Sequence, residues 1–209
     1  MNKNKIYHRK PSIHKLEPGD VLIIYPNDKN LYIIAQGILV MSRLFSNGER
    51  FSSDIIHTGY MIKDMFKNKR IYNYCYEMTT VSPTYIINIS KGSEHSNKQY
   101  SVDHYCGKTL PKTSFSSLWA HKNIRNRIIH LLLILSEITG YENNYSLSIS
   151  IDLQLSYQLI ATITGSTRNT VSKMIKQMEK DNIIIYNNKK IIIYSLLNLN
   201  KYSTSIISK

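Results

Sequence analysis

Three side chains near residue 170 have the chemistry that reads the bases of double-stranded DNA. Arg168 and Asn169 are neighbours, and Lys173 follows about one helical turn later. Arginine can form two parallel hydrogen bonds to O6 and N7 of guanine, asparagine can do the same to N6 and N7 of adenine, and lysine can reach guanine or phosphate. If one helix carries all three, their spacing predicts that this helix enters the major groove.

Hydroxyl and further basic side chains surround these residues. Hydroxyl groups suit phosphate oxygens, which fix the register of a protein on DNA without reading its sequence, and lysines neutralise phosphate charge. The remaining candidate DNA contacts are Ser166, Thr167, Thr170, Ser172, Lys176 and Lys189. We therefore expect base readers and phosphate contacts to share one surface.

Two helices joined by a tight turn are expected to carry these side chains. Ser156 is a good N-cap for a short helix over Tyr157–Thr164. Gly165 supplies the backbone freedom that the turn of a helix-turn-helix often needs. Ser166 or Thr167 can then cap a second helix that runs to about Asp181. This pattern predicts a helix-turn-helix over Ser156–Ile175.

The second helix separates into two faces. Apolar residues recur at helical spacing, which favours a buried stripe, and the polar candidates lie on the other side. The stripe consists of Val171, Met174, Ile175 and Met178. An amphipathic surface helix with a basic outer side has the same pattern, so the neighbouring elements decide between the two interpretations.

Two β-rich segments follow this helix. Asn182–Tyr186 and Lys190–Leu196 are separated by Asn187-Asn188-Lys189, which can form a tight tip. The pair predicts a wing with Lys189 at its tip, close to phosphate. A winged helix-turn-helix is more specific than a lone amphipathic helix and favours DNA binding.

The N-terminal part is typical of short strands. Turn signals recur about every ten residues between Lys15 and Ile89, and Ser46-Asn47-Gly48-Glu49 has the composition of a hairpin tip. The expected strands are Val21–Tyr25, Leu31–Ala35, Ile38–Leu44, Asp54–His57, Tyr74–Val81 and Tyr85–Ile89. The pattern predicts an antiparallel β-roll, and with the C-terminal helices an α+β fold.

Two helical runs are expected between these parts. One begins near Ser114, with Phe115, Leu118 and Trp119 on one face, and the other covers Ile124–Thr139 before Gly140. The spacing leaves open whether they are continuous or kinked, and whether Leu118 and Trp119 line a dimer seam or pack in the core. The expected organisation is a basic tail (1–12), a β-roll (13–90), a loop and linker or dimer helix (91–123) and a DNA-binding domain (124–209).

Composition limits the classes of function. The 209 residues carry a net charge of +13 and a sequence pI of about 9.6, which favours a polyanionic partner. Cys75 and Cys106 form no C-x-x-C pair, and His57, His95 and His104 are scattered. We find no nucleotide-binding or hydrolase motif, so no catalytic residue, metal or cofactor is expected. No membrane segment or secretory signal is expected either.

The run from Gly165 to Lys173 resembles the recognition-helix signature of the cyclic-AMP-receptor/FNR-type regulators. Within them it is most similar to the nitrogen-control regulators of cyanobacteria (NtcA type) and their plastid-encoded relatives in red algae. The resemblance extends loosely through the β-roll, at Tyr32–Gly37, Ser42-Arg43 and Gly48-Glu49. It implies a homodimeric transcription regulator, usually an activator working with RNA polymerase, that reads a palindrome.

By this resemblance Arg168 contacts guanine and Lys173 is its neighbour along the groove. The NtcA-type regulators carry Val where this chain has Asn169 and Arg where it has Lys173, so the half-site preference is expected to differ. Residues encoded by A/T-rich codons are abundant, which agrees with a plastid gene and a chloroplast stroma location; a gene outside the plastid would imply the cytoplasm.

The effector side of the resemblance is weaker. Family members hold an anionic effector in the β-roll with a glycine-containing loop and an arginine, and the NtcA-type effector is 2-oxoglutarate. Over Met61–Met78 the family's Gly-Glu and Arg-Ser pattern is missing. Tyr74 takes the position of the arginine, and Arg70 lies nearby. We therefore expect no cyclic nucleotide. 2-oxoglutarate is a candidate effector by the resemblance alone, because no residue of this stretch supports it.

The alternative is a non-specific architectural or RNA-binding protein. Such proteins interleave basic residues with exposed aromatic ones, and Ile71–Tyr76 is the densest aromatic run among 16 tyrosines. The same alternation also indicates a strand with one buried face.

Overall fold

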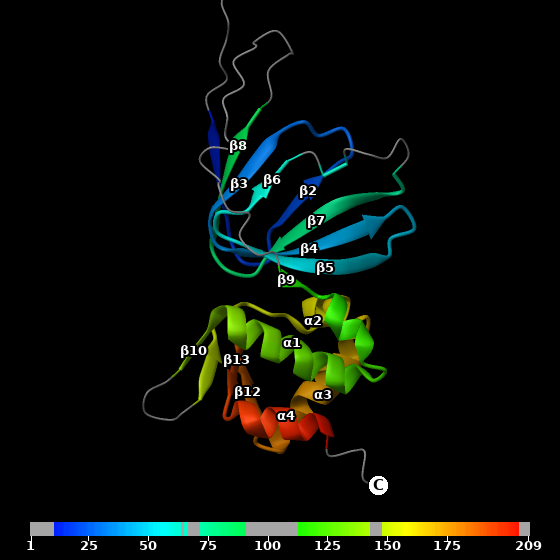
Figure 1. Ribbon diagram of the computed structural model, residues 1–209, viewed down its shortest axis with the longest axis vertical. Coiled ribbons are helices and arrows are strands. Elements are labelled where there is room, and N and C mark those ends of the chain that lie inside the picture. Colours follow the sequence, from blue (N-terminus) through cyan, green and yellow to red (C-terminus); the bar gives the residue numbers. More distant parts are fainter. Residues whose placement is uncertain (1–10, 64, 67–71, 91–112, 143–147, 205–209) are drawn as a thin grey trace, which may run out of the picture.

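The computed structural model describes residues 11–63, 65–66, 72–90, 113–142 and 148–204. Its N-terminal strands form an antiparallel β-roll, and its C-terminal residues form a helical domain with a small sheet (Figure 1). The expected α+β fold with a β-roll followed by a winged helix-turn-helix is confirmed. Arg70 and the loop from 91 to 112 lie outside the described residues.

The β-roll consists of two sheets whose neighbouring strands all pair antiparallel. One sheet has the order β1 (Ser12–Leu16), β8 (Thr84–Ile89), β3 (Leu31–Gln36) and β6 (Met61–Ile62). The other has the order β2 (Val21–Ile24), β7 (Tyr74–Thr80), β4 (Ile38–Phe45), β5 (Arg50–His57) and β9 (Thr113–Ser114). The expected hairpin tip joins β4 to β5, with Gly48 at φ 86°.

Alternation along β4 explains how the roll is filled. Leu39 and Met41 point into its interior, where they pack with residues of both sheets, such as Ile34 of β3 and Met78 of β7. Val40, the intervening residue, is equally buried but belongs to a different cluster, on the outer face of the sheet. β4 is therefore covered on both faces, as expected of a strand buried between two layers.

The C-terminal domain covers that outer face. After the 3-10 helix η2 (Ser116–Ala120) it contains α1 (Ile124–Thr139), α2 (Tyr157–Thr164), α3 (Arg168–Lys180) and α4 (Leu196–Thr204). Its sheet has the order β10 (Gly140–Glu142), β11 (Ile149–Ile151), β13 (Lys190–Ile193) and β12 (Ile184–Asn187).

One continuous core joins this domain to the β-roll. Ile128, Leu131, Leu132 and Leu135 recur every three or four residues on α1 and are fully or almost fully buried. They belong to the same cluster as Val40 of β4, together with side chains of α2, α3 and the small sheet. Burial of apolar surface stabilises the fold by roughly 25 cal/mol per Å², so the β-roll and the helical domain stabilise each other.

The segment before α1 corrects the sequence prediction. The helix expected from Ser114 is the short η2, and the chain is extended at His121 before Asn123 caps α1 through its side chain. The two helical runs are therefore separate. Leu118 is fully buried inside the monomer, so a dimer seam through this side chain is wrong, whereas core packing is confirmed.

Other elements were not predicted. The strand expected over Lys190–Leu196 ends at Ile193, and Leu196 instead begins α4. Leu199 of α4 is fully buried in the main core, and the helix packs on α1. A helix this short is only marginally stable by itself and depends on tertiary packing. Its sequence therefore gave little helical signal.

A histidine pair connects η2 to α1. His121 Nε2 and His130 Nδ1 are 2.8 Å apart, and the two rings meet edge to face. Burial and the neighbouring His121 ring lower the pKa of His130 below its ordinary value of 6.5. The folded protein therefore takes up a proton at His130 less readily than the unfolded chain does.

This shift predicts that acid destabilises the fold. Below about pH 6.5 the unfolded chain binds more protons at this position than the folded one, so the free energy of unfolding falls as the pH falls. We expect the melting temperature to drop between pH 7.5 and 5.5, and to drop less in a His130→Gln variant. His57, whose pKa burial also lowers, is tested separately as His57→Gln. An equal drop in wild type and His130→Gln would contradict the prediction.

Candidate DNA-binding surface

The helix-turn-helix begins with a local capping interaction. The Ser156 hydroxyl accepts a hydrogen bond from the backbone N–H of Leu159 at 3.1 Å, as expected of an N-cap. α2 then places Ile160 and Ile163 in the main core. The start of α2 and its buried face are therefore as predicted.

The turn depends on one backbone conformation. Gly165 has φ 64° and ψ 47°, the left-handed region that glycine adopts at the end of a helix. The Gly165 N–H donates to the carbonyl of Ala161, and the Ser166 N–H donates to the same carbonyl at 2.9 Å. Thr167, rather than Ser166, caps α3, because its side chain accepts from the N–H of Thr170 at 3.2 Å.

α3 has one buried and one open face. Val171, Ile175 and Met178 are buried, and Met174 is half-buried. The predicted base readers Arg168, Asn169 and Lys173 are exposed on the other side, as is Lys176. The first turn of α3 contains no acidic residue. Its positive end, the free N–H groups and two polar side chains therefore face solvent together.

The hydroxyl candidates differ in availability. The Oγ1 atoms of Thr167 and Thr170 lie 2.9 Å apart and share a hydrogen bond at the N-terminus of α3. Ser172 is half-buried and interacts with the Tyr157 hydroxyl. The Ser166 Oγ is buried and has no hydrogen-bond partner among the described residues. Thr167 and Thr170 are thus better placed for phosphate than Ser166 or Ser172.

The predicted wing is formed by β12 and β13. Their tip contains Asn188 and Lys189, both with positive φ (48° and 64°), as in the mirror-image turns of tight hairpins. Lys189 is exposed, whereas the neighbouring Lys190 forms an ion pair with Asp152. The cation that the wing tip offers to a phosphate is therefore Lys189.

The wing is tied to the start of α2. The backbone N–H of Leu155 donates to the carbonyl of Lys189 at 2.8 Å, and the Tyr186 hydroxyl donates to the carbonyl of Leu155 at 2.8 Å. The rings of Tyr157 and Tyr186 stack 4.6 Å apart. Burial and the adjacent Tyr157 and Glu179 raise the pKa of Tyr186 to about 12, so this hydroxyl keeps its proton at neutral pH. The wing tip and the helix-turn-helix consequently form one rigid surface.

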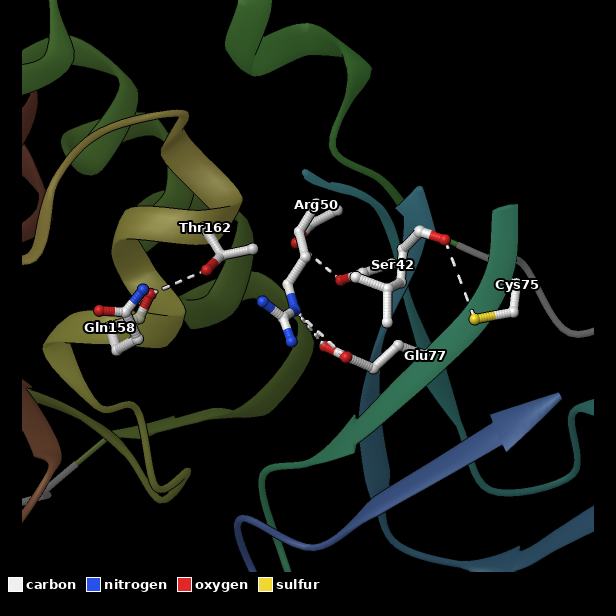
Figure 2. A network of polar contacts seen from close by, with 8 residues as sticks. Ser42, Arg50, Cys75, Glu77, Gln158 and Thr162 are labelled. Atoms are coloured by element: carbon white, nitrogen blue, oxygen red, sulfur yellow. Dashed lines mark hydrogen bonds and ion pairs between the residues drawn. The ribbon is translucent and has the colours of Figure 1, made fainter. Parts of the chain in front are cut away.

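The β-roll meets this domain at α2. β5 packs on α2, and Figure 2 shows Arg50 between the sheet and the helix that carries Gln158 and Thr162. Arg50 Nε donates to both carboxylate oxygens of Glu77, at 3.0 and 3.2 Å. The charge of Arg50 is therefore paired within the sheet.

The effector candidate Tyr74 packs among other aromatic side chains of the β-roll. Tyr74 belongs to an aromatic cluster with Phe66, Tyr72 and Tyr76. The Arg43 guanidinium lies 5.3 Å from the centre of the Tyr74 ring, and its Nε is buried without a hydrogen-bond partner among the described residues. Sequence reasoning missed Arg43 as an effector candidate. The signal in the sequence was its spacing, since Arg43 follows Leu39 and Met41 at every second residue of β4 and therefore shares their inward face.

Other classes of site find no support in the described residues. No cluster of three or more histidine, cysteine, aspartate or glutamate side chains could hold a metal ion in this part of the chain. Among the same residues, no helix is both long and apolar enough to cross a membrane.

Comparisons with known proteins agree with this geometry. A sequence model of the Crp-like helix-turn-helix domain matches residues 126–202. The chain is 27% identical to the HTH-type transcriptional regulator ycf28 of Porphyra purpurea, over 87% of this chain and 78% of that protein. It is 22% identical to the global nitrogen regulator of Synechococcus elongatus, over 88% of this chain and 86% of that protein.

Solved structures show the same fold. A CRP-family transcriptional regulator of Thermus thermophilus superposes with a TM-score of 0.65 at 15% identity, covering 92% of this chain and 97% of that one. A second CRP/FNR-family regulator of that bacterium has a TM-score of 0.60 at 17% identity, covering 93% and 99%. These relatives are transcription regulators and not enzymes. With its Crp-like helix-turn-helix domain at residues 126–202 and its β-roll, the chain is similar to the DNA-binding transcription regulators of the CRP/FNR type and has their fold.

Proposed function

We propose that the chain binds a palindromic DNA site as a homodimer and activates nitrogen-controlled genes. The observation that carries the DNA-reading part is the open first turn of α3, where Arg168 and Asn169 are exposed beyond the Gly165 turn while the opposite face is buried. A two-fold dimer places one such helix in each half-site, and this symmetry makes the site palindromic.

The regulatory part of the proposal is supported by the relatives. Three proteins that match this chain along most of its length are named global nitrogen regulator. Activation through RNA polymerase is the usual mode of the CRP/FNR type. The matching ycf28 protein of a red alga supports a plastid gene and the chloroplast stroma as the location.

The half-site follows from the side chains of α3. Arg168 suits guanine, Asn169 suits adenine, and Lys173 reaches guanine or phosphate one turn later. Lysine lacks the planar two-pronged geometry of arginine. We therefore propose a half-site that differs from that of regulators with Val and Arg at these two positions.

Selection of binding sites from random duplex DNA, with and without 2-oxoglutarate, tests the proposal. The expected result is a palindrome that the full chain prefers over bulk DNA by roughly 10³-fold or more at fixed salt. Equal affinity for all duplexes, or for RNA, would support a non-specific architectural or RNA-binding protein instead.

Arg168→Ala is predicted to weaken binding to the selected site by roughly 1–3 kcal/mol, because it removes one bidentate base contact. Binding to bulk DNA should change much less, and the preference should relax at a single base pair. Fluorescence anisotropy with the selected duplex and with bulk DNA measures both affinities. An equal loss on both would show that Arg168 contacts only phosphate.

Lys176→Ala and Lys189→Ala are predicted to weaken binding to every duplex alike. Each removes one exposed cation, so the slope of log K against log salt should become about one unit shallower. Lys29→Ala, which removes an exposed cation from the β-roll, is the matched control and should leave the slope unchanged. If Lys176 or Lys189 behaves like Lys29, it lies outside the interface.

For the effector we propose 2-oxoglutarate, with the Arg43 guanidinium as the cation that holds it. The partly unsatisfied Arg43 guanidinium inside the roll supports this assignment. Calorimetry should detect saturable binding of 2-oxoglutarate to wild type and its loss in Arg43→Gln. Arg50→Gln, which removes a charge already paired with Glu77, is the matched control. No binding to wild type would reject the effector.

A further inference from the structure

Trp119 lies where the β-roll, the linker and the helix-turn-helix meet. Its ring stacks on Phe51 of β5, with centres 5.7 Å apart and planes inclined by 23°. A β-carbon built on Gly165 would come within 2.5 Å of Cη2 of the same ring. The ring of Trp119 therefore packs directly against the turn between α2 and α3, and leaves room there for no side chain.

Arg127 of α1 joins the same contact from another direction. Its guanidinium carbon lies 4.6 Å from the centre of the Trp119 ring. Its Nε donates to the carbonyl of His121 at 2.9 Å, and its Nη1 donates to the carbonyl of Thr164 at 3.1 Å. One planar side chain thus holds the linker and the last residue of α2 at fixed positions.

The bond to Thr164 is favourable for two reasons. Carbonyl groups in the last turn of a helix carry partial negative charge and lack intrahelical donors, so a cation stabilises them. A hydrogen bond from a charged donor is also stronger than one between neutral groups. The Thr164 side chain is completely buried, so the carbonyl that Arg127 holds belongs to a residue packed in the core.

The position of this turn decides where the base readers lie. Gly165 is three residues before Arg168, and Thr167 caps α3 between them. A recognition helix must hold its side chains close to the productive geometry to form bidentate contacts with bases. A shift of the turn therefore moves Arg168 and Asn169 relative to the groove.

We infer that Trp119 and Arg127 are positioning residues for base recognition: together with Phe51 they clamp the helix-turn-helix turn to strand β5 of the β-roll. The inference rests on the proposed DNA-reading function. Trp119 and Arg127 contact the turn and the linker. They affect base recognition indirectly, by setting the position of α3.

The conservative variant Arg127→Lys tests the clamp in the full chain. Lysine keeps the charge but has no planar group. It therefore cannot donate to the carbonyls of His121 and Thr164 and at the same time cover the Trp119 ring. The affinity for the selected duplex should fall roughly tenfold, since misplacing a bidentate contact forfeits much of its discrimination. Affinity for bulk DNA and its salt slope should be unchanged, because no charge is lost.

Arg125→Lys is the matched control. Arg125 lies in the same first turns of α1 and covers the ring of Tyr202, 3.6 Å from its centre, in place of the Trp119 ring. This variant should keep the ratio of specific to bulk affinity. A lower ratio of specific to bulk affinity in both variants would overturn the inference, because it would indicate general destabilisation of α1. An unchanged ratio in both variants would overturn it as well, because Arg127 would then have no effect on base recognition.

Trp119 fluorescence gives a readout that does not need DNA. It is the only tryptophan in the chain, so its emission reports the clamp directly. Arg127→Lys should shift the emission and Arg125→Lys should not. If wild type prefers no duplex while the emission still shifts, the proposed function fails but the clamp stands; an unshifted emission rejects the clamp itself.

Trp119→Phe is the second variant if Arg127→Lys melts too low for binding measurements. Phenylalanine can still stack on Phe51 but is too small to fill the space beside Gly165. The specific affinity should fall while bulk affinity stays. A Trp119→Phe protein with the wild-type ratio of specific to bulk affinity would overturn the inference.

Discussion

The left-handed backbone at Gly165 is the constraint on which the DNA-reading surface depends. Its φ of 64° lets α2 end and α3 begin within a few residues, and its missing side chain lets the Trp119 ring approach. A residue with a β-carbon would be strained by the backbone angle and would also collide with that ring. The exposed first turn of α3 and its buried opposite face are both consequences of where this turn lies.

Packing makes the two parts of the chain interdependent. The five-stranded sheet is covered on its inner face by the interior of the roll and on its outer face by the helical domain, so Leu39 and Val40 of one strand belong to different clusters. The linker contributes Phe115 and Leu118 to the shared core. A change in the strands can therefore reach the helices through buried contacts, which is a physical basis for linking a sensor to a reader.

Exposed and paired charges lie on different surfaces of the protein. Arg168, Lys173, Lys176 and Lys189 are exposed on α3 and the wing tip. By contrast, Lys190 and Arg50 are neutralised by Asp152 and Glu77. Inside the roll, Arg43 lies among tyrosine rings. The net charge of +13 favours a polyanionic partner. The exposed charges on α3 and the wing tip make that surface the candidate binding site.

Features with local causes can be predicted from the amino-acid sequence. Ser156 and Gly165 bound α2, Asn188 and Lys189 form the wing tip, and the apolar stripe of α3 follows from helical spacing, because each depends on residues close in the chain. Four other features became visible only in the folded chain: the burial of Leu118, the packing of α4 on α1, and the positions of Arg43 and Trp119. These depend on partners distant in sequence, and local propensity and periodicity carry no information about such contacts.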